Sequence, residues 1–578
     1  MTPRMDGMKT ESVFIRVYPW LAVIVAVALG LRVVGLRYGL PAVYNPDEVA
    51  IMSRALAFGK GDLNPHNFLY PSLYFYVLFL WEGLTAAAAV AIRAVDSFGA
   101  FQREFFLDPT RVYVAGRLLT ALLGSATVAA TFALARRIAG PVAGIAAALA
   151  VAVSPLHVRD SHYVKHDVPV TLLIVLAYLA YERLWRVFPS ETGDFEEVRD
   201  SEVIWAAVVT GLAFSTHYYA IFLAIPLAWS AARRAATTGE AVRRVAIAAV
   251  VSAAIFFVCS PFMLVEPATA LRDIQANRQI VVDRAVGTLG YGATLGRYGR
   301  MLLWDTLGWP FVAAAGLGTL LMLRDDARRA AWLFAFPVPF FLFIASTYPA
   351  SRYLIPLVPF LAVLAGVAIA AVARQDRRVA WVTAGVLAWL PVQASIRTDL
   401  FIRQTDTRTL AREFIETHVP PGATILTQPY SVPLEPTAAS LREAVSRTGR
   451  EMPTKTSLQM DRNPYPAPAY RLIYLGRGMD ADKLYLPLEA LAPDPMAPIR
   501  GEHVAFVVLK RYNDEAPVTS PLTAALARDG RRLAVFSPYR EGAATRPEPF
   551  LHNTDARIAA ALERSGPVVE IWQLNGLR

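Results

Sequence analysis

The chain has 578 residues, of which 55% are hydrophobic and 18% are charged, and its mean hydropathy is +0.37. Soluble domains carry about 25% charged residues, so this composition excludes an ordinary soluble protein. The net charge of +10 does not indicate a nucleic-acid-binding protein, because many arginines flank apolar segments, as in membrane proteins. With only one cysteine, Cys259, no disulfide framework can form.

Apolar runs of about 20 residues, the length that crosses a bilayer, recur between residues 17 and 396. The first run contains Arg32 and leads directly to acidic residues, so we interpret it as a retained anchor rather than a cleaved signal. If every basic cluster faces the cytoplasm, alternation gives a mostly α-helical bundle of about eleven spans with a cytoplasmic N-terminus. The predicted spans are 17–36, 113–136, 138–156, 168–188, 203–215, 217–232, 245–263, 301–322, 330–347, 353–373 and 379–396.

Segment 71–93 is also long enough to cross the membrane, but we predict that it does not. If it crossed, Arg136 and Arg137 would face outside and Asp167 would face the cytoplasm, away from Asp47, against the positive-inside rule. We therefore expect a helix at the outer interface, within one long external loop over residues 37–112 that carries juxtamembrane helices.

The composition changes after residue 396, where polar residues, prolines and short β-rich runs replace the apolar segments. We expect two domains, a transmembrane catalytic domain over 1–396 and an external mixed α/β domain over 397–578. Strands are predicted at 423–428, 471–476, 503–509, 532–538 and 568–574, and helices at 406–418, 521–528 and 555–564.

The acidic pair Asp47-Glu48 follows the first span directly. A structural interpretation makes Asn45 a helix N-cap, Pro46 the first helical residue and Glu48 the partner of a capping box. A functional interpretation rests on the cost of placing two carboxylates at the rim of a membrane bundle. Adjacent acids tend to raise the pKa of one of them, as a general base requires. The two interpretations are compatible, because a cap can hold a neighbouring carboxylate rigidly.

A second polar cluster lies between two predicted spans and contains His162, Lys165, His166 and Asp167. It is either a solvated loop with local ion pairs or a site that faces the membrane surface. Together with His66 it could bind a divalent metal ion, although no spacing in it is diagnostic of a metal site.

Two arginines, Arg117 and Arg352, stand near the outer ends of predicted spans. Each needs an anion there, or else extends to lipid headgroups. Because guanidinium groups suit phosphate, two of them near two acids predict a phosphate-bearing, lipid-linked ligand. His217 lies at a third rim position, either in the site or as a hydrogen-bonding residue between helices.

These residues together resemble the GT-C superfamily of membrane glycosyltransferases, in the branch of the protein O-mannosyltransferases and aminoarabinose transferases. The resemblance covers about residues 1–396 and rests on the order of loose motifs. They are the acidic pair Asp47-Glu48, the proline-led segment 67–74, Arg117 before small residues, Asp167 in the second loop, and Arg352 in an Arg-Tyr-Leu-Ile-Pro sequence.

The resemblance implies inverting transfer of a sugar from a polyprenyl-phosphate-linked donor, on the outer face of the bacterial inner membrane. Asp47 would be the general base, Glu48 and Asp167 the nearby carboxylates, and Arg117 and Arg352 the cations that neutralise the departing phosphate. The acceptor stays open between a glycan, a lipid and a protein. Substrate contacts are expected from His66, Tyr70, His162, His166 and His217.

The chain departs from the aminoarabinose transferases at Leu69 and Tyr70, where those enzymes have a glutamate-lysine pair. Lys165, His66 or Lys60 would have to replace the missing phosphate-binding lysine, and we assign this role first to Lys165. Two alternatives remain open from the sequence. One is a transporter or flippase of a lipid-linked substrate, for which we find no internal repeat, and the other is an enzyme similar to oligosaccharyltransferases or oligosaccharide ligases.

Overall fold

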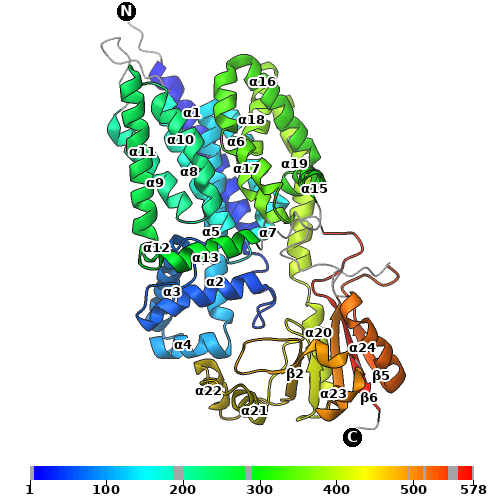
Figure 1. The fold of residues 1–578 in the computed structure, drawn as a ribbon. Helices are drawn as coiled ribbons and strands as arrows, with labels where there is room; N and C mark the ends of the chain where they lie inside the picture. The colour runs from blue at the N-terminus through cyan, green and yellow to red at the C-terminus, as the bar shows by residue number, and fades with distance from the viewer. Residues whose placement is uncertain are drawn as a thin grey trace, which may run out of the picture.

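The computed structural model describes residues 6–185, 199–279, 290–492, 494–511, 516–543 and 558–575. It is mostly helical, with one six-stranded sheet in the C-terminal part. Figure 1 shows a bundle of long helices and a separate domain at one end of it, close to the helices that follow the first span. The mostly helical fold and the C-terminal α/β domain predicted from the sequence are thus present.

The bundle combines long helices with several short ones at its ends. The long or central helices are α1 (Asp6–Val33), α5 (Thr110–Ala139), α6 (Pro141–Ala152), α8 (Asp167–Trp185), α9 (Asp200–Phe214), α10 (Ala224–Ala232), α11 (Thr238–Cys259), α16 (Trp309–Phe334), α17 (Pro337–Ile344), α18 (Val358–Gln375) and α19 (Arg377–Ile402). The short ones are α7 (Pro155–Asp160), η2 (Tyr218–Leu223), α12 (Phe262–Val265), α13 (Pro267–Arg278), α15 (Tyr291–Met301), η4 (Leu302–Thr306) and η5 (Ser351–Leu357).

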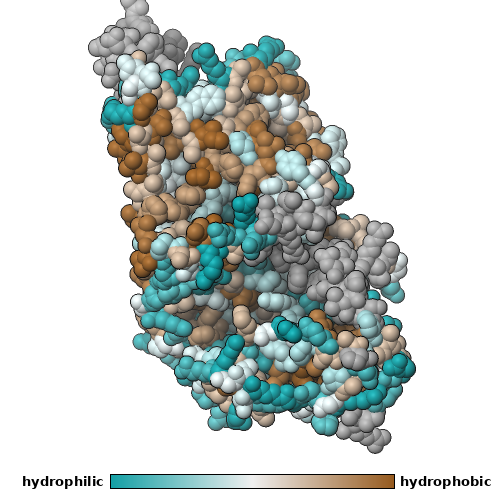
Figure 2. Space-filling model, viewed as in Figure 1, coloured by the Kyte–Doolittle hydropathy of each residue, from teal (hydrophilic) through white to brown (hydrophobic). Residues whose placement is uncertain are grey.

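Six helices of the described residues are long and apolar enough to cross a membrane, or seven if one sharply bent pair counts as a span. The protein is therefore a multi-pass membrane protein, and Figure 2 shows hydrophobic side chains on the flank of the bundle and hydrophilic ones over the end near the C-terminal domain. The prediction of eleven spans is not confirmed. Several predicted spans correspond to apolar helices that are too short, such as α6, or cross a sharp bend, as the predicted span 301–322 does between Thr306 and Trp309.

Helix α3 (Leu73–Ala91) is one of the six candidates by length and composition, but it lies at the rim of the bundle. Its N-terminus meets the ends of α9 and α11, where Leu73 N donates to Ser215 O and Ser72 N donates to Ser260 Oγ. Farther along, it packs against α2, α4 and the first turns of α5, where Trp81 donates to the Ala115 carbonyl. Figure 1 shows α3 together with α2 (Pro46–Ala57) and α4 (Phe98–Leu107) at the end nearest the C-terminal domain. The interfacial placement of this helix expected from the sequence stays a prediction.

The centre of the bundle is held together by close backbone contacts at two glycines. A Cβ atom on Gly318 of α16 would lie 1.9 Å from the Leu364 carbonyl oxygen of α18, and one on Gly366 of α18 would lie 2.5 Å from the Ala143 carbonyl oxygen of α6. Only glycine allows the three helices to approach so closely, as small residues generally do in membrane helix pairs.

The C-terminal domain contains a sheet with the strand order β3-β2-β1-β4-β6-β5. The first four strands in this order are parallel, and β6 is antiparallel to both β4 and β5. The strands are β1 (Thr424–Thr427), β2 (Arg471–Leu475), β3 (Leu484–Leu486), β4 (Phe506–Arg511), β5 (Gly530–Phe536) and β6 (Val568–Leu574). The helices are α20 (Thr407–His418), α21 (Ala438–Thr448), α22 (Thr454–Met460), η6 (Leu488–Leu491), α23 (Met496–Gly501) and α24 (Ala516–Asp529).

All five strands predicted from the sequence are present, within three residues at each end, whereas β3 and the helices α21 to α23 were missed. The predicted helix at 555–564 is wrong in its described part. Residues 558–564 form turns and one isolated bridge between Leu562 and Tyr539, because they pair with another segment instead of forming helical hydrogen bonds. Residues 555–557 lie outside the described part of the chain.

The domain contacts the first loop through aromatic side chains. The hydroxyl of Tyr44 lies 2.7 Å from Thr409 Oγ1, the Arg408 guanidinium lies over the Tyr44 ring at 3.7 Å, and the Tyr38 hydroxyl donates to Asp406 at 3.4 Å. These contacts place the domain next to the segment that carries the acidic pair.

The substitution Gly318→Ala tests the close contact between α16 and α18. We expect it to lower the unfolding free energy by about 1–3 kcal/mol, because backbone atoms must move to admit the methyl group, and to lower the melting temperature of the detergent-purified protein. The control is Gly316→Ala, two residues earlier on the same helix, where a Cβ would have open space. Equal melting temperatures for the two variants would contradict the packing argument.

Candidate active site

The acidic pair sits on the first turn of α2, as the sequence predicts. Asn45 precedes the helix and its side chain accepts a hydrogen bond from Asp47 N at 3.1 Å, and Pro46 is the first helical residue. The expected capping box is wrong, because Glu48 points into the protein instead of back to Asn45. The helix buries Glu48, Ile51, Met52 and Ala55.

Glu48 forms a buried ion pair with Arg117 of α5. Arg117 Nε donates to Glu48 Oε1 at 2.9 Å and Arg117 Nη2 donates to Oε2 at 2.7 Å, while Nη1 donates to the Leu36 and Tyr38 carbonyls at 2.7 Å each. Glu48 also accepts from Val164 N at 3.0 Å. Both side chains are almost completely buried, and all three guanidinium nitrogens of Arg117 have protein partners. This geometry favours a positioning role for both residues, in place of the catalytic and phosphate-binding roles expected from the sequence.

Asp47 faces the opposite way and meets two cations. Its Oδ2 atom lies 3.2 Å from Lys165 Nζ and 3.7 Å from Arg352 Nη1. The Asp47 side chain is 36% exposed, whereas Lys165 and Arg352 are 3% and 14% exposed. Asp167, at the first turn of α8, is buried within electrostatic range of all three residues. The structure therefore brings together Asp47, Lys165, Asp167 and Arg352, which come from three distant parts of the sequence.

The polar segment 156–167 is buried throughout, so it is not the solvated loop considered from the sequence. Its first part is the short helix α7, and its two histidines beyond that helix have different surroundings. His162 is enclosed between two carbonyls, with Nδ1 2.9 Å from Val158 O and Nε2 2.7 Å from Val34 O. This contact joins α7 to the end of α1, and it favours a structural role over the substrate contact expected for His162.

His166 belongs instead to an aromatic wall. Its ring stacks on Tyr70 with the ring centroids 4.3 Å apart, and Tyr70 in turn lies 5.2 Å from His217. Neither ring nitrogen of His166 has a hydrogen-bond partner within the described residues. Burial, followed by the charge of Arg54, lowers the pKa of His166 to about 3, and burial lowers the pKa of His217 well below its usual value. Both histidines are thus neutral at pH 7.

His66 lies in a separate place at the surface of the first loop. It pairs with Asp62 at 2.8 Å and with Glu266 at 2.9 Å, and the hydrogen bond to Asp62 raises its pKa. No contact joins it to Asp47 in the described structure. Among the residues that the structure describes, no group of three or more His, Cys, Asp or Glu side chains is arranged to hold a metal ion.

A largely apolar cavity of about 580 Å³ begins at the aromatic wall. Tyr70, His217 and Tyr353 line it on the side of the charged cluster, because Tyr353 follows Arg352 and its ring centroid lies 5.0 Å from that guanidinium. The rest of the lining comes from Tyr218, Tyr219, Ile221, Phe222, Ile274, Asn277, Arg278, Phe343, Ile344, Ser346 and Thr347.

The sequence analysis missed two residues near the cluster, Tyr353 and Arg54. Arg54 is half-buried on α2, and its charge acts on Tyr70 and His166. In the sequence, only its spacing from Asp47 indicates that Arg54 lies near the cluster, because residues seven apart lie on the same face of a helix.

Known membrane glycosyltransferases resemble this chain both in sequence and in fold. A family model described as dolichyl-phosphate-mannose-protein mannosyltransferase matches residues 110–264. The fold is similar to that of ArnT from Cupriavidus metallidurans bound to undecaprenyl phosphate, with a TM-score of 0.50 and 14% identity over 97% of this chain and 99% of that chain. These matches confirm the resemblance to the GT-C superfamily of membrane glycosyltransferases.

Other solved structures share the fold. The apo form of the oligosaccharyltransferase from Archaeoglobus fulgidus aligns with a TM-score of 0.51 and 13% identity, over 90% of this chain and 73% of that chain. No curated protein matches the sequence. At these identities the solved structures show that the fold is shared over nearly the whole chain, and the chemistry is argued from the residues of this chain.

Replacing Glu48 should destabilise the protein more than replacing its neighbour. Glu48→Gln leaves Arg117 buried without its counter-ion, so we expect a loss of about 3–5 kcal/mol in the unfolding free energy. Asp47→Asn should cost less, about 1 kcal/mol, because Asp47 is one-third exposed and Asp167 remains near Lys165 and Arg352 to balance their charge. Thermal unfolding in detergent measures both, and similar losses would contradict the division between the two acids.

The stability of the protein should fall on acidification because of His166. Between pH 6.5, the usual histidine pKa, and about 3, the unfolded chain binds a proton at this residue and the folded chain does not. Stability therefore decreases as the pH falls, by about 2 kcal/mol from this group at pH 5. Melting temperatures measured from pH 7.5 to 5 should fall less steeply for His166→Gln than for wild type, whereas replacement of the exposed His418 should leave the slope unchanged.

Proposed function

We propose that the protein transfers a sugar, with inversion, from a polyprenyl-phosphate-linked donor to an acceptor at the bundle end that carries Asp47. The observation that carries this proposal is the contact of one partly exposed carboxylate, Asp47, with two largely buried cations, Lys165 and Arg352. A base and a pair of fixed cations are the groups that this reaction needs, because a phosphate leaves as a stable anion and needs no acid to protonate it.

The donor phosphate would bind Lys165 and Arg352. Burial of these cations strengthens their attraction for an anion, because the surrounding dielectric is lower than in water. Arg54, on the same helix as Asp47, adds a third positive charge beside the aromatic wall. Arg117 is omitted from this set because Glu48 and two carbonyls already hold its guanidinium. A bound phosphate would compete with Asp47 for the same two cations and so release the carboxylate for the reaction.

The lipid of the donor would occupy the cavity of about 580 Å³ next to Tyr353. Away from the charged cluster the cavity is lined by aromatic and aliphatic side chains, among them Phe222, Phe343 and Ile344. The arrangement of a charged end and an apolar end matches an amphiphilic donor, and the volume lies within the usual range of ligand sites.

In the proposed step Asp47 accepts the proton of the acceptor hydroxyl or amine. The acceptor atom forms a bond to the anomeric carbon on one face of the sugar while the bond to the phosphate oxygen breaks on the other, which inverts the configuration. The electron pair of the broken bond stays on the phosphate, beside Lys165 and Arg352. Asp167 is the second carboxylate near the sugar, where it would stabilise positive charge that develops on the ring.

Asp47→Asn tests the base. In membranes that contain the protein and a radiolabelled polyprenyl-phosphate sugar, we expect the variant to release label from the donor about 10²–10⁴-fold more slowly than wild type, with donor binding retained. Asp96→Asn is the matched control, because Asp96 is an exposed acid of the same first loop and forms no ion pair with any residue that the structure describes. Equal turnover by wild type and Asp47→Asn would remove Asp47 as the base.

The fold likeness to the archaeal oligosaccharyltransferase is compatible with a second candidate, an enzyme that transfers a longer glycan. The same assay separates the two candidates when a donor with a single sugar is compared with a donor that carries an oligosaccharide. Faster turnover of the oligosaccharide donor would favour the second.

A further inference from the structure

A second cavity, of about 600 Å³, lies at the opposite end of the bundle from the candidate active site. Helix α5 connects the two places, since Arg117 belongs to the site and Ile138 lines the cavity. The 21 residues between them correspond to about 32 Å along a helix, which is close to the roughly 30 Å thickness of the hydrocarbon core of a bilayer. The two places therefore lie near opposite faces of the membrane.

The cavity forms where the tightly packed helices separate. Gly318 and Gly366 hold α16, α18 and α6 in backbone contact directly beside the cavity, which Val367, the neighbour of Gly366, lines. Beyond these contacts, α16 bends at Asp326 and α18 continues to its end at Gln375, which leaves a gap between them and the α5–α6 connection. Its apolar lining is Ile138, Ala139, Pro141, Val142, Met322, Val367, Ala370 and Ala373.

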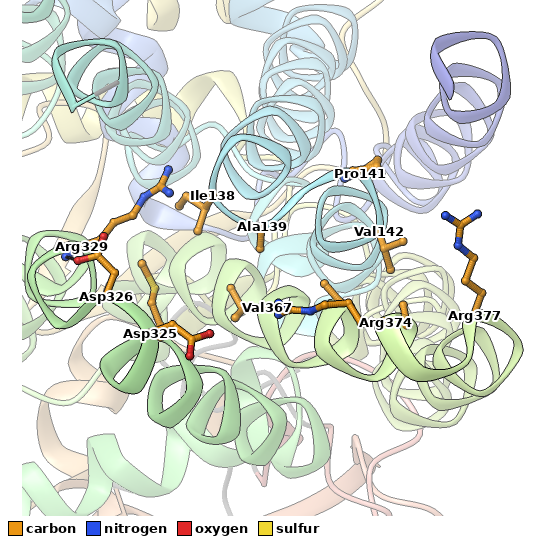
Figure 3. Close-up of a pocket in the computed structure, with 13 residues that line it drawn as sticks. Ile138, Ala139, Pro141, Val142, Asp325, Asp326, Arg329, Val367, Arg374 and Arg377 are labelled. Atoms are coloured by element: carbon orange, nitrogen blue, oxygen red, sulfur yellow. Dashed lines mark hydrogen bonds between the residues drawn. The ribbon is translucent and has the colours of Figure 1, made fainter. Parts of the chain in front are cut away.

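At the mouth of the cavity, some of the arginine side chains have no acidic partner among the described residues. Asp325 pairs with Arg324 at 3.5 Å, the Asp326 side chain accepts from Arg329 N at 2.9 Å, and Arg329 pairs with Glu182 at 3.1 Å. Arg374 and Arg377 are exposed, and neither has an ion pair in the described part of the chain. Figure 3 shows the Arg374 side chain extended over the opening, between Asp325 and Val142, with Arg377 at its outer edge.

We propose that this cavity binds an anionic phospholipid from the adjacent leaflet, with Arg374 on the phosphate and part of an acyl chain on the apolar lining. Basic pockets between membrane helices hold anionic headgroups in this way. Arg377 adds positive potential at the edge of the site. An unpaired guanidinium, an apolar cavity and the position at the membrane face together match a ligand with a phosphate and a hydrocarbon chain.

The positive-inside rule accounts for arginines at this end without any specific ligand. The chain offers a matched control for that explanation. Arg378 is exposed, follows Arg377 directly and does not line the cavity. A general attraction of the surface for anionic lipid would depend on Arg378 as much as on Arg374, whereas a built site depends on Arg374 alone.

The test uses the full-length protein in neutral detergent, with native mass spectrometry to count bound lipid. Wild type should retain phosphatidylglycerol about 10-fold more tightly than phosphatidylcholine or phosphatidylethanolamine, because the ammonium group of these two zwitterionic lipids offsets the phosphate charge that attracts Arg374 and Arg377. Arg374→Gln should lose most of this preference, and Arg378→Gln should keep it. Competition with inorganic phosphate at equal concentration should displace little of the lipid, because phosphate lacks the chain.

Equal losses in the two variants would overturn the proposal in favour of surface charge. Equal retention of all three lipids, or a preference for phosphatidylethanolamine, would overturn the choice of an anionic headgroup. Displacement by inorganic phosphate would assign the site to free phosphate instead of a lipid. The wild-type comparison of lipids decides the matter by itself if Arg374→Gln does not fold.

Discussion

The ion pair between Glu48 and Arg117 is the interaction on which the candidate site depends. It joins α2 to α5, and through the carbonyls of Leu36 and Tyr38 and the amide of Val164 it also joins the end of the first helix to the segment before α8. Consecutive residues on a helix point about 100° apart. Once Glu48 is held inside, Asp47 must face elsewhere, and that direction brings it to Lys165 and Arg352. The two adjacent acids thus have different partners: Glu48 pairs with buried Arg117, and Asp47 meets Lys165 and Arg352.

The cluster around Asp47 combines charge on one side with apolar surface on the other. Tyr70 stacks on His166 and, with His217, lines the apolar cavity, and both histidines of the wall are neutral because burial lowers their pKa. The positive charge is therefore restricted to lysine and arginine side chains, which keep it at any physiological pH. This arrangement suits a ligand that carries an anion at the end of a hydrocarbon chain.

The C-terminal domain packs against the first loop at Tyr38 and Tyr44. Its first helix begins with Asp406, whose carboxylate is held by Arg408, and the same arginine lies over Tyr44, three residues before Asp47. The domain is thus fastened next to the chain segment that leads into α2.

Local patterns in the sequence determined the membrane character, the strands of the C-terminal sheet, the cap at Asn45 and the resemblance to GT-C enzymes, because periodicity, turn chemistry and motif order are properties of neighbouring residues. The number of spans was not accessible in this way, since hydropathy does not reveal that α6 is only 12 residues long or that the chain bends by 104° between Thr306 and Trp309. Arg117 and Arg352 look alike in the sequence, each at the start of an apolar run, and so do His162 and His166, four residues apart. Only the tertiary structure decided that Arg117 and His162 serve the scaffold while Arg352 and His166 lie near Asp47. The physical reason is that a buried polar group is defined by the partner it finds, and these partners come from distant parts of the chain.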